Sequence, residues 1–248
     1  SVEEVVPENY TQQSNDCKES KEACTITNKV DDLSKTYPVK KTWNDGNNQD
    51  GMRKTVTVTL TGTVEGSEWK YTDTKELSDP NWADVFENIP VFHEGKLISY
   101  SVTEEAITFD STQHSTGYTT TYNNDYTVEG VKGTEVINTH TPETTKVKVT
   151  KEWDDNSNQD GFRPGTITIK VLDGTTIVDS NTQVTGSSTG RTWSFTSKEL
   201  PKYRNGQEIE YTVEEEFTTD PEDAYTQGTP SGNVTGTPTG TVTGTPTG

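Results

Sequence analysis

Apolar and polar residues alternate along several segments of this chain, a period of two that predicts half-buried β-strands. The faces predicted to point inward are Tyr37, Val39, Lys41, Trp43; Ile98, Tyr100, Val102, Glu104; Val147, Val149, Lys151, Trp153; and Ile209, Tyr211, Val213, Glu215. Each face contains one charged residue among apolar ones. A buried charge without a partner costs on the order of several kcal/mol. We therefore expect each lysine to meet a glutamate.

These segments belong to two copies of one sequence. Residues 39–45 (VKKTWND) return as residues 149–155 (VTKEWDD), and NQDG follows each copy at 48–51 and at 158–161. We align Trp69 and Tyr71 with Trp193 and Phe195 in the same way. The offset of about 110 residues suits one compact domain per copy and is too long for a solenoid unit.

Composition supports thin-cored β domains. The 248 residues are only 26% hydrophobic, with a mean hydropathy of -0.89, but ten Tyr, five Trp and abundant Thr and Val argue against disorder. The formal charge of -19 disfavours nucleic acid and anionic membranes as partners. No segment is long and apolar enough for a membrane span, and the residues from Ser1 onward lack the basic and apolar character of a signal segment, so we expect a mature or excised fragment.

Cys17 and Cys24 are the only cysteines and share one short polar stretch. We expect a hairpin disulfide, which indicates an oxidising, extracellular setting. Two free thiols are the alternative. A metal site is disfavoured because no histidine lies nearby in the sequence.

The sequence predicts four regions. Residues 1–33 form the C-terminal part of a preceding repeat, 34–143 a first full repeat, 144–239 a second full repeat, and 240–248 a Gly/Thr/Pro-rich tail that is flexible or extended.

An asparagine marks the end of the first full repeat. Asn138 shares a strand face with Val136, and Asn28, with Glu4 before it, takes the matching place in residues 1–33. In the second full repeat Gly236 occupies that place, and the nearby Asn233 has the wrong parity.

A lysine, a glutamate and an asparagine held together in an apolar core can react. Burial favours the neutral amine and the neutral carboxyl. The amine can then attack the carboxamide carbon and release ammonia while the carboxyl transfers protons. The alternative is a buried salt bridge with the asparagine as a neutral neighbour.

The strings Lys-x-Trp-(Asp/Asn)-Asp with Asn-Gln-Asp-Gly, Tyr-(Ser/Thr)-Val-x-Glu and Ile-Asn-Thr-His-Thr resemble the Cna protein B-type domain of Gram-positive surface adhesins and pilins. The resemblance covers Thr36 to Pro142, Thr145 to about Thr239, and the half copy before Asp31. It implies tandem immunoglobulin-like β-sandwiches in a linear array. It also implies a spontaneous isopeptide bond.

Carried onto this sequence, the bond joins Lys41 to Asn138 with Glu104 as the catalytic carboxyl. Lys151 and Glu215 match the same pattern in the second full repeat, but Gly236 offers no electrophile. The partner of Lys151 is therefore open, as is that of Asn28.

Other polar groups receive plainer interpretations. The segments around Asp45, Asp50, Asp155 and Asp160 are weak calcium-site candidates, and we favour Asx-rich turns because the downstream bidentate glutamate is missing. No cofactor motif or catalytic triad is recognisable, so we expect no enzyme acting on an outside substrate.

Two functions follow from these observations. The first is a structural stalk or fibre segment on the cell surface or cell wall, whose partners are neighbouring repeats or other copies of the protein. The second is an adhesin module that binds a host matrix protein or glycan through Trp82, Phe86 and Phe92, in an insertion from Leu77 to Phe92 that the second copy lacks. We also consider that residues 1–29 of one molecule dock on the C-terminal domain of the next, linking Asn28 to Lys151.

Overall fold

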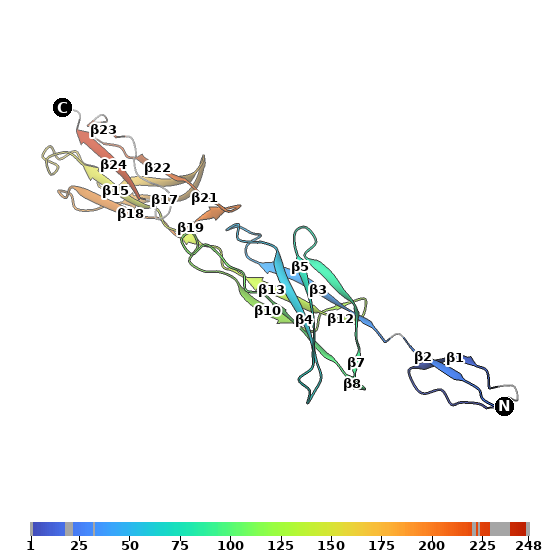
Figure 1. Ribbon diagram of the computed structural model, residues 1–248. Helices are drawn as coiled ribbons and strands as arrows, with labels where there is room; N and C mark the ends of the chain where they lie inside the picture. The colour runs from blue at the N-terminus through green and yellow to red at the C-terminus, as the bar shows by residue number, and fades with distance from the viewer. Residues whose placement is uncertain are drawn as a thin grey trace. The chain divides into compact units, whose positions relative to one another are not determined.

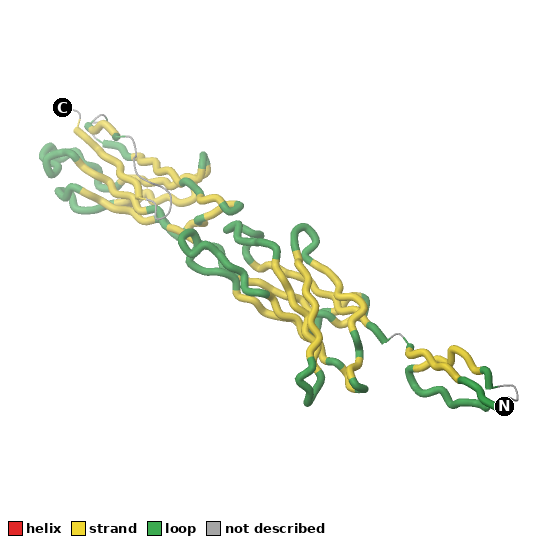
Figure 2. Tube along the Cα trace, in the orientation of Figure 1, coloured by secondary structure: helices red, strands yellow, loops and turns green. Residues whose placement is uncertain are grey.

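The computed structural model describes residues 2–17, 22–31, 33–219, 222, 224–228 and 239–246. Among these residues the regular secondary structure consists of β-strands only, so the described part of the tube in Figure 2 is yellow and green without red. The all-β prediction is confirmed.

Strands β3 to β13 form the first full repeat (Figure 1). Their bounds are β3 Lys35–Asn44, β4 Val56–Thr63, β5 Lys70–Leu77, β6 Ala83–Ile89, β7 Phe92–His93, β8 Lys96–Leu97, β9 Ser99–Glu104, β10 Thr119–Asn123, β11 Thr127–Val128, β12 Val131–Lys132 and β13 Thr134–Thr139. The two main sheets have the strand orders β10-β13-β3-β6 and β5-β4-β9. Two small hairpins, β7-β8 and β11-β12, extend from them.

Strands β14 to β24 form the second full repeat. Their bounds are β14 Thr144–Thr145, β15 Lys148–Trp153, β16 Ile167–Asp173, β17 Thr176–Val184, β18 Thr192–Thr196, β19 Leu200–Pro201, β20 Tyr203–Arg204, β21 Gln207–Glu208, β22 Tyr211–Glu216, β23 Tyr225–Gln227 and β24 Thr239–Pro246. The sheet orders β18-β15-β24-β23 and β17-β16-β22 repeat those of the first copy strand for strand.

The alternation in the sequence explains each core. In β4 the residues Val56, Val58 and Leu60 are buried while the threonines between them are half-buried, so one face of the strand packs inward. The core of the second repeat draws on both of its sheets: Val147, Val149, Trp153, Ile167, Ile169, Val171, Val184, Trp193, Leu200, Ile209, Tyr211 and Val213. Two sheets that bury their inner faces against each other make a β-sandwich.

The second repeat closes on a different segment from the one predicted. Residues 239–246 form β24, which runs parallel to β15 with Val242 opposite Lys151. Residues 240–246, which we expected to belong to a flexible or extended tail after the second repeat, are extended in β24 and pair with β15. Gly236 and Asn233, the residues that we expected in the closing strand, lie outside the described residues. The octets 233–240 and 241–248 are nearly identical, so the local pattern could not choose between them.

The alignment of Trp69 with Trp193 is also wrong. Trp69 immediately precedes β5, which pairs with β4, whereas Trp193 lies in β18 and pairs with Lys151 of β15. The true counterpart of β18 is β6, which pairs with β3. The segment 77–92 is consequently not an insertion but contains a strand common to both repeats.

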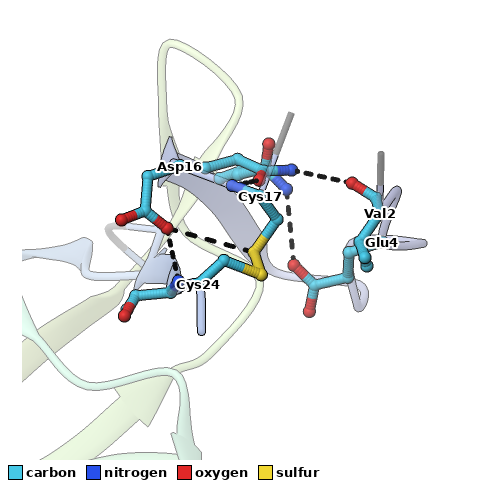
Figure 3. Close-up of a disulfide and its surroundings, with 8 residues drawn as sticks. Val2, Glu4, Asp16, Cys17 and Cys24 are labelled. Carbon is cyan, nitrogen blue, oxygen red and sulfur yellow. Dashed lines mark hydrogen bonds between the residues drawn. A yellow bond between two sulfur atoms is a disulfide. The ribbon is translucent and has the colours of Figure 1, made fainter. Parts of the chain in front are cut away.

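The N-terminal segment is a separate two-stranded element. Strands β1 (Tyr10–Asn15) and β2 (Ile26–Val30) pair antiparallel, and a disulfide joins Cys17 to Cys24 with a Cα–Cα distance of 4.8 Å (Figure 3). Val2 N donates a hydrogen bond to Cys17 O at 3.2 Å, so the chain start lies along this element.

The residues group into two compact units that do not coincide with the two repeats. The first unit comprises residues 1–42, 54–108 and 118–138, and the second comprises 43–53, 109–117 and 139–248. Two loops of the first repeat therefore belong to the second unit.

Candidate functional site

Lys41, Glu104 and Asn138 meet inside the first repeat. Lys41 lies on β3 and Asn138 on the adjacent β13, whereas Glu104 ends β9 in the opposite sheet. Lys41 Nζ is 3.4 Å from Glu104 Oε2, and these side chains are 0% and 1% exposed. Asn138 Nδ2 donates a hydrogen bond of 2.7 Å to Glu104 Oε1. The three sequence-predicted residues thus share one water-excluded place between the sheets.

Further contacts orient this trio. Lys41 Nζ donates to Val136 O at 3.3 Å, and Thr120 Oγ1 donates to Glu104 Oε1 at 3.3 Å. Asn138 Oδ1 is buried and has no hydrogen-bond partner among the described residues. A half turn of the amide group exchanges its oxygen and nitrogen without changing its shape. That turn places the Asn138 oxygen against the Glu104 carboxyl, where a protonated Glu104 can polarise the carbonyl.

The second repeat contains the corresponding lysine and glutamate. Lys151 Nζ of β15 lies 2.7 Å from Glu215 Oε1 of β22, and both side chains are buried. The amine also stands over the rings of Trp153 and Phe217, 4.3 and 5.0 Å from their centroids. Burial lowers the pKa of Lys151 and raises the pKa of Glu215, and in each case the partner's charge opposes the shift. Desolvation therefore favours the neutral pair here.

Among the described residues of the second repeat, no asparagine takes the place of Asn138. In the first repeat His140 N, two residues beyond Asn138, donates to Asn44 O at 2.9 Å. In the second repeat the equivalent register pairs Trp153 with Gly244. The place of Asn138 therefore falls on Gly244 rather than on Gly236, and in either register a glycine occupies it.

Glu4 and Asn28 also lie together, as the sequence predicts for the end of a repeat. Asn28 Nδ2 donates to Glu4 Oε1 at 2.9 Å, and Gln12 Nε2 donates to Glu4 Oε2 at 3.4 Å. Glu4 and Asn28, two members of a possible cross-linking trio, therefore meet in the element that contains the disulfide, where Figure 3 labels Glu4. The docking hypothesis needs an open sheet edge beside β15, and β24 fills that position. The position beside β15 is therefore not available to Asn28 without displacement of β24.

Asp45 and Asp155 each bind an arginine that the sequence analysis overlooked. Arg53 Nε and Nη2 donate to the two oxygens of Asp45 at 2.9 and 2.7 Å, and Arg163 donates to Asp155 in the same way at 2.9 and 2.5 Å. Each aspartate also accepts from the backbone N–H three residues on, at 3.0 Å. These are Asx-type turns closed by a bidentate ion pair. The sequence does contain a signal for these ion pairs, because an arginine follows the aspartate by eight residues in both copies.

The other two weak metal candidates diverge. Asp160 is exposed, whereas Asp50 is buried and its Oδ2 lies 2.7 Å from His140 Nε2. His114 and Glu143 lie close to Asp50 as well. Nothing in the local sequence pattern links positions 50, 114 and 140, so their proximity could not be predicted from the sequence.

The fold and the buried trio define a class: tandem immunoglobulin-like sandwiches with a lysine, a glutamate and an asparagine at the interface of the two sheets. The family model for the Cna protein B-type domain matches residues 37–139 and 147–239. The chain belongs to this family.

Relatives of known type support the assignment. The chain is 34% identical over 199 residues to the collagen adhesin of Staphylococcus aureus, covering 77% of this chain and 14% of that protein. It is also similar to the crystal structure of two B repeat units of the collagen-binding protein of S. aureus, with a TM-score of 0.61 and 30% identity, covering 98% of this chain and 55% of the other. Among the described residues no helix has the length and apolar character to cross a membrane.

Proposed function

We propose that this chain is a stalk segment of a bacterial surface adhesin or pilus-like fibre, stabilised by a spontaneous isopeptide bond between Lys41 and Asn138. The observation that carries the proposal is the buried contact of Lys41 with Glu104 and of Glu104 with Asn138. A spacer needs domains that resist heat, force and proteases, and a covalent bond between the first and last strands of a sandwich supplies that resistance.

The reaction needs no outside reagent. A proton passes from Lys41 Nζ to Glu104 across their 3.4 Å contact, leaving a neutral amine and a neutral acid. The amine attacks the Asn138 side-chain carbonyl carbon while the Glu104 acid hydrogen-bonds the oxygen. The new C–N bond forms, the bond to the amide nitrogen breaks, and Glu104 transfers the proton that lets ammonia leave. The fold supplies proximity, and each molecule reacts once.

The second repeat stays uncrosslinked in this proposal. Lys151 and Glu215 are in place, but Gly244 offers no carbonyl side chain and neither does Gly236. In this proposal each chain carries out one self-cross-linking reaction, in the first repeat. An extracellular, cell-surface or cell-wall location agrees with the disulfide between Cys17 and Cys24 and with the adhesin relative.

Intact mass spectrometry of the full chain tests the bond. We expect the wild-type mass to be lower by one ammonia, in addition to the two hydrogens lost to the disulfide. Glu104→Gln should restore the ammonia without unfolding the repeat, and peptide mapping should find Lys41 and Asn138 in one branched peptide. Unlinked Lys41 and Asn138 peptides from the wild-type chain would refute the bond.

A second candidate function is ligand binding, but not through the full aromatic set expected from the sequence, because Phe86 is buried in the core and Trp82 is only half-exposed. The exposed member, Phe92, lies in the hairpin β7-β8. Its strands pair Phe92 with Leu97, and these two apolar side chains are 44% and 63% exposed. An exposed apolar pair is a common feature of contact surfaces. The relevant ligands are matrix proteins such as collagen, because a relative is a collagen adhesin. Binding of immobilised collagen by the wild-type chain but not by Phe92→Ala would support this candidate.

A further inference from the structure

A cluster of metal-ligand side chains lies outside the cross-link sites, in the second compact unit. It consists of Asp50, His114 and Glu143, and we call it the linker cluster. Asp50 lies in the loop between β3 and β4, His114 lies in the loop 105–118, and Glu143 lies in the segment between β13 and β14. One ligand atom from each residue lies within 4.8 Å of the other two.

All three side chains are well shielded from solvent, with exposed fractions of 1%, 7% and 11% for Asp50, His114 and Glu143. Two of their atoms lack partners: Asp50 Oδ1 and His114 Nδ1 are buried, and no described residue forms a hydrogen bond with either. The nearest charged oxygen to His114 Nδ1 is Glu143 Oε1, at 3.6 Å, which is too long for a hydrogen bond. Buried polar atoms in folded proteins almost always have a hydrogen-bond partner or a ligand, so these two atoms indicate a binding site.

The surrounding groups hold the carboxylates in place. Asp50 Oδ2 lies 2.7 Å from His140 Nε2 and accepts from Glu143 N at 2.9 Å. His140 Nδ1 lies 3.2 Å from Gly117 O, so both of its ring nitrogens face oxygens that can only accept. Such outer contacts typically orient the ligands of a metal ion.

Glu143 is also prepared as an anion. Its Oε1 accepts from Ser115 N at 2.8 Å, and Lys202 Nζ lies 3.4 Å from its Oε2. The Ser115 N–H and the Lys202 ammonium both face the Glu143 carboxyl group, and such contacts favour the carboxylate, the form that binds a metal ion.

We propose that the linker cluster is a binding site for a divalent transition cation of the zinc type. The donor set of one imidazole nitrogen and two carboxylate oxygens matches zinc, whereas calcium takes oxygen ligands. A bound cation would satisfy both Asp50 Oδ1 and His114 Nδ1, the two buried atoms that have no hydrogen-bond partner among the described residues. An open cavity of about 750 Å³ borders the cluster, lined in part by His114, Glu143 and Lys202, and admits water as a fourth ligand.

The consequence is mechanical. The ligands come from two loops of the first repeat and from the segment that precedes β14, so one bound ion ties three chain segments together. The site is specific to this place, because the second-repeat counterpart of Asp50 is the exposed Asp160. The only other such group in the described residues, at Asp16, Cys17 and Cys24, has both sulfurs in the disulfide.

Isothermal titration of the full chain with zinc chloride tests the proposal. We expect one zinc ion per chain, and thermal unfolding that shifts upward with zinc because the ion binds the folded state. His114→Ala and Asp50→Asn should each lose this binding, with circular dichroism showing that the variants remain folded. The outer variant His140→Gln should weaken binding by roughly 10- to 100-fold.

Matched controls separate the site from general surface binding. His93→Ala removes a histidine that stacks on Trp69, and Asp160→Asn removes the exposed counterpart of Asp50, so both should bind zinc as the wild type does. Equal zinc affinity in His114→Ala and the wild type, calcium binding as tight as zinc binding, or no zinc binding by the wild type would each overturn the proposal.

Discussion

Trp153 pairs with Gly244 where β15 and β24 run side by side in parallel. The matching place in the first repeat belongs to Asn138. Among the described residues, the second repeat keeps the buried Lys151 and Glu215 but has a glycine at that place. In the proposed function, this difference separates a repeat that forms the covalent bond from one that does not.

Gly244→Asn should therefore create a cross-link to Lys151. The expected product is lighter by one further ammonia and yields a branched peptide that contains both residues. The matched control is Gly236→Asn, which tests the register expected from the sequence alone. If Gly236→Asn reacts and Gly244→Asn does not, the pairing of β24 with β15 has been assigned to the wrong octet.

Lys151→Met should make the second repeat sensitive to pH. The folded pKa of Glu215 is already raised above its usual 4.5 by burial, and Lys151 is the group that opposes the rise. Without Lys151 the pKa of Glu215 in the folded state should rise further above 4.5, so Glu215 stays protonated to a higher pH in the folded state. Stability is then present at low pH and lost as pH rises through the folded pKa. We expect the variant to lose about 3–5 kcal/mol at pH 8 and less at pH 5.

The control for this prediction is the double variant Lys151→Met/Glu215→Gln, which has no buried carboxyl to ionise. Denaturant unfolding at pH 5 and pH 8 measures both variants. A pH dependence in the single variant that equals that of the double variant would mean that Glu215 does not carry the effect.

Phe86→Ala should destabilise the first repeat, whereas Phe92→Ala should not. Phe86 of β6 lies opposite Tyr37 of β3 and is 0% exposed. Its truncation leaves a cavity in the core and should lower the free energy of unfolding by about 3–5 kcal/mol. Phe92 is largely outside the core, and its loss should change the free energy of unfolding by less than about 0.5 kcal/mol. Thermal unfolding compares the two, and equal losses would contradict the assignment of β6 to the core sheet.

Arg163→Met should weaken the second repeat more than Arg53→Met weakens the first. Arg163 is buried against Asp155, whereas the Arg53 side chain is 22% exposed. A broken buried pair costs about 3–5 kcal/mol because a charge is left uncompensated.

The same pair sets a dependence on pH. Burial alone would raise the pKa of Asp155, but hydrogen bonds from Arg163 and Tyr225 lower it below the usual 3.8. The pair therefore stabilises the fold above pH 3.8, and that contribution is lost as pH falls through the folded pKa. We expect the difference in the free energy of unfolding between the wild type and Arg163→Met, measured by urea unfolding, to become smaller as the pH falls below 3.8. A gap that is unchanged at low pH would show that packing, not charge, explains the loss.

The sequence by itself determined the features that depend on a single strand and those that recur in both copies. Alternation placed Lys41 and Glu104 on inward faces because successive side chains of a strand point to opposite sides, and a buried charge demands a partner. The duplicated strings also identified two domains of one kind and the place of Asn138. These inferences need only the geometry of one strand and the comparison of two copies.

Only the tertiary structure decided which strands pair and which distant residues meet. Two nearly identical octets compete for the closing position, and pairing with β15 and β23 selects residues 239–246. Trp69 and Trp193 look alike in the sequence but lie at different sheet positions, because a strand's place depends on its hydrogen-bonded neighbours rather than on its own pattern. The linker cluster brings together Asp50 and Glu143, which are 93 positions apart, a proximity that chain folding creates and that no local periodicity encodes.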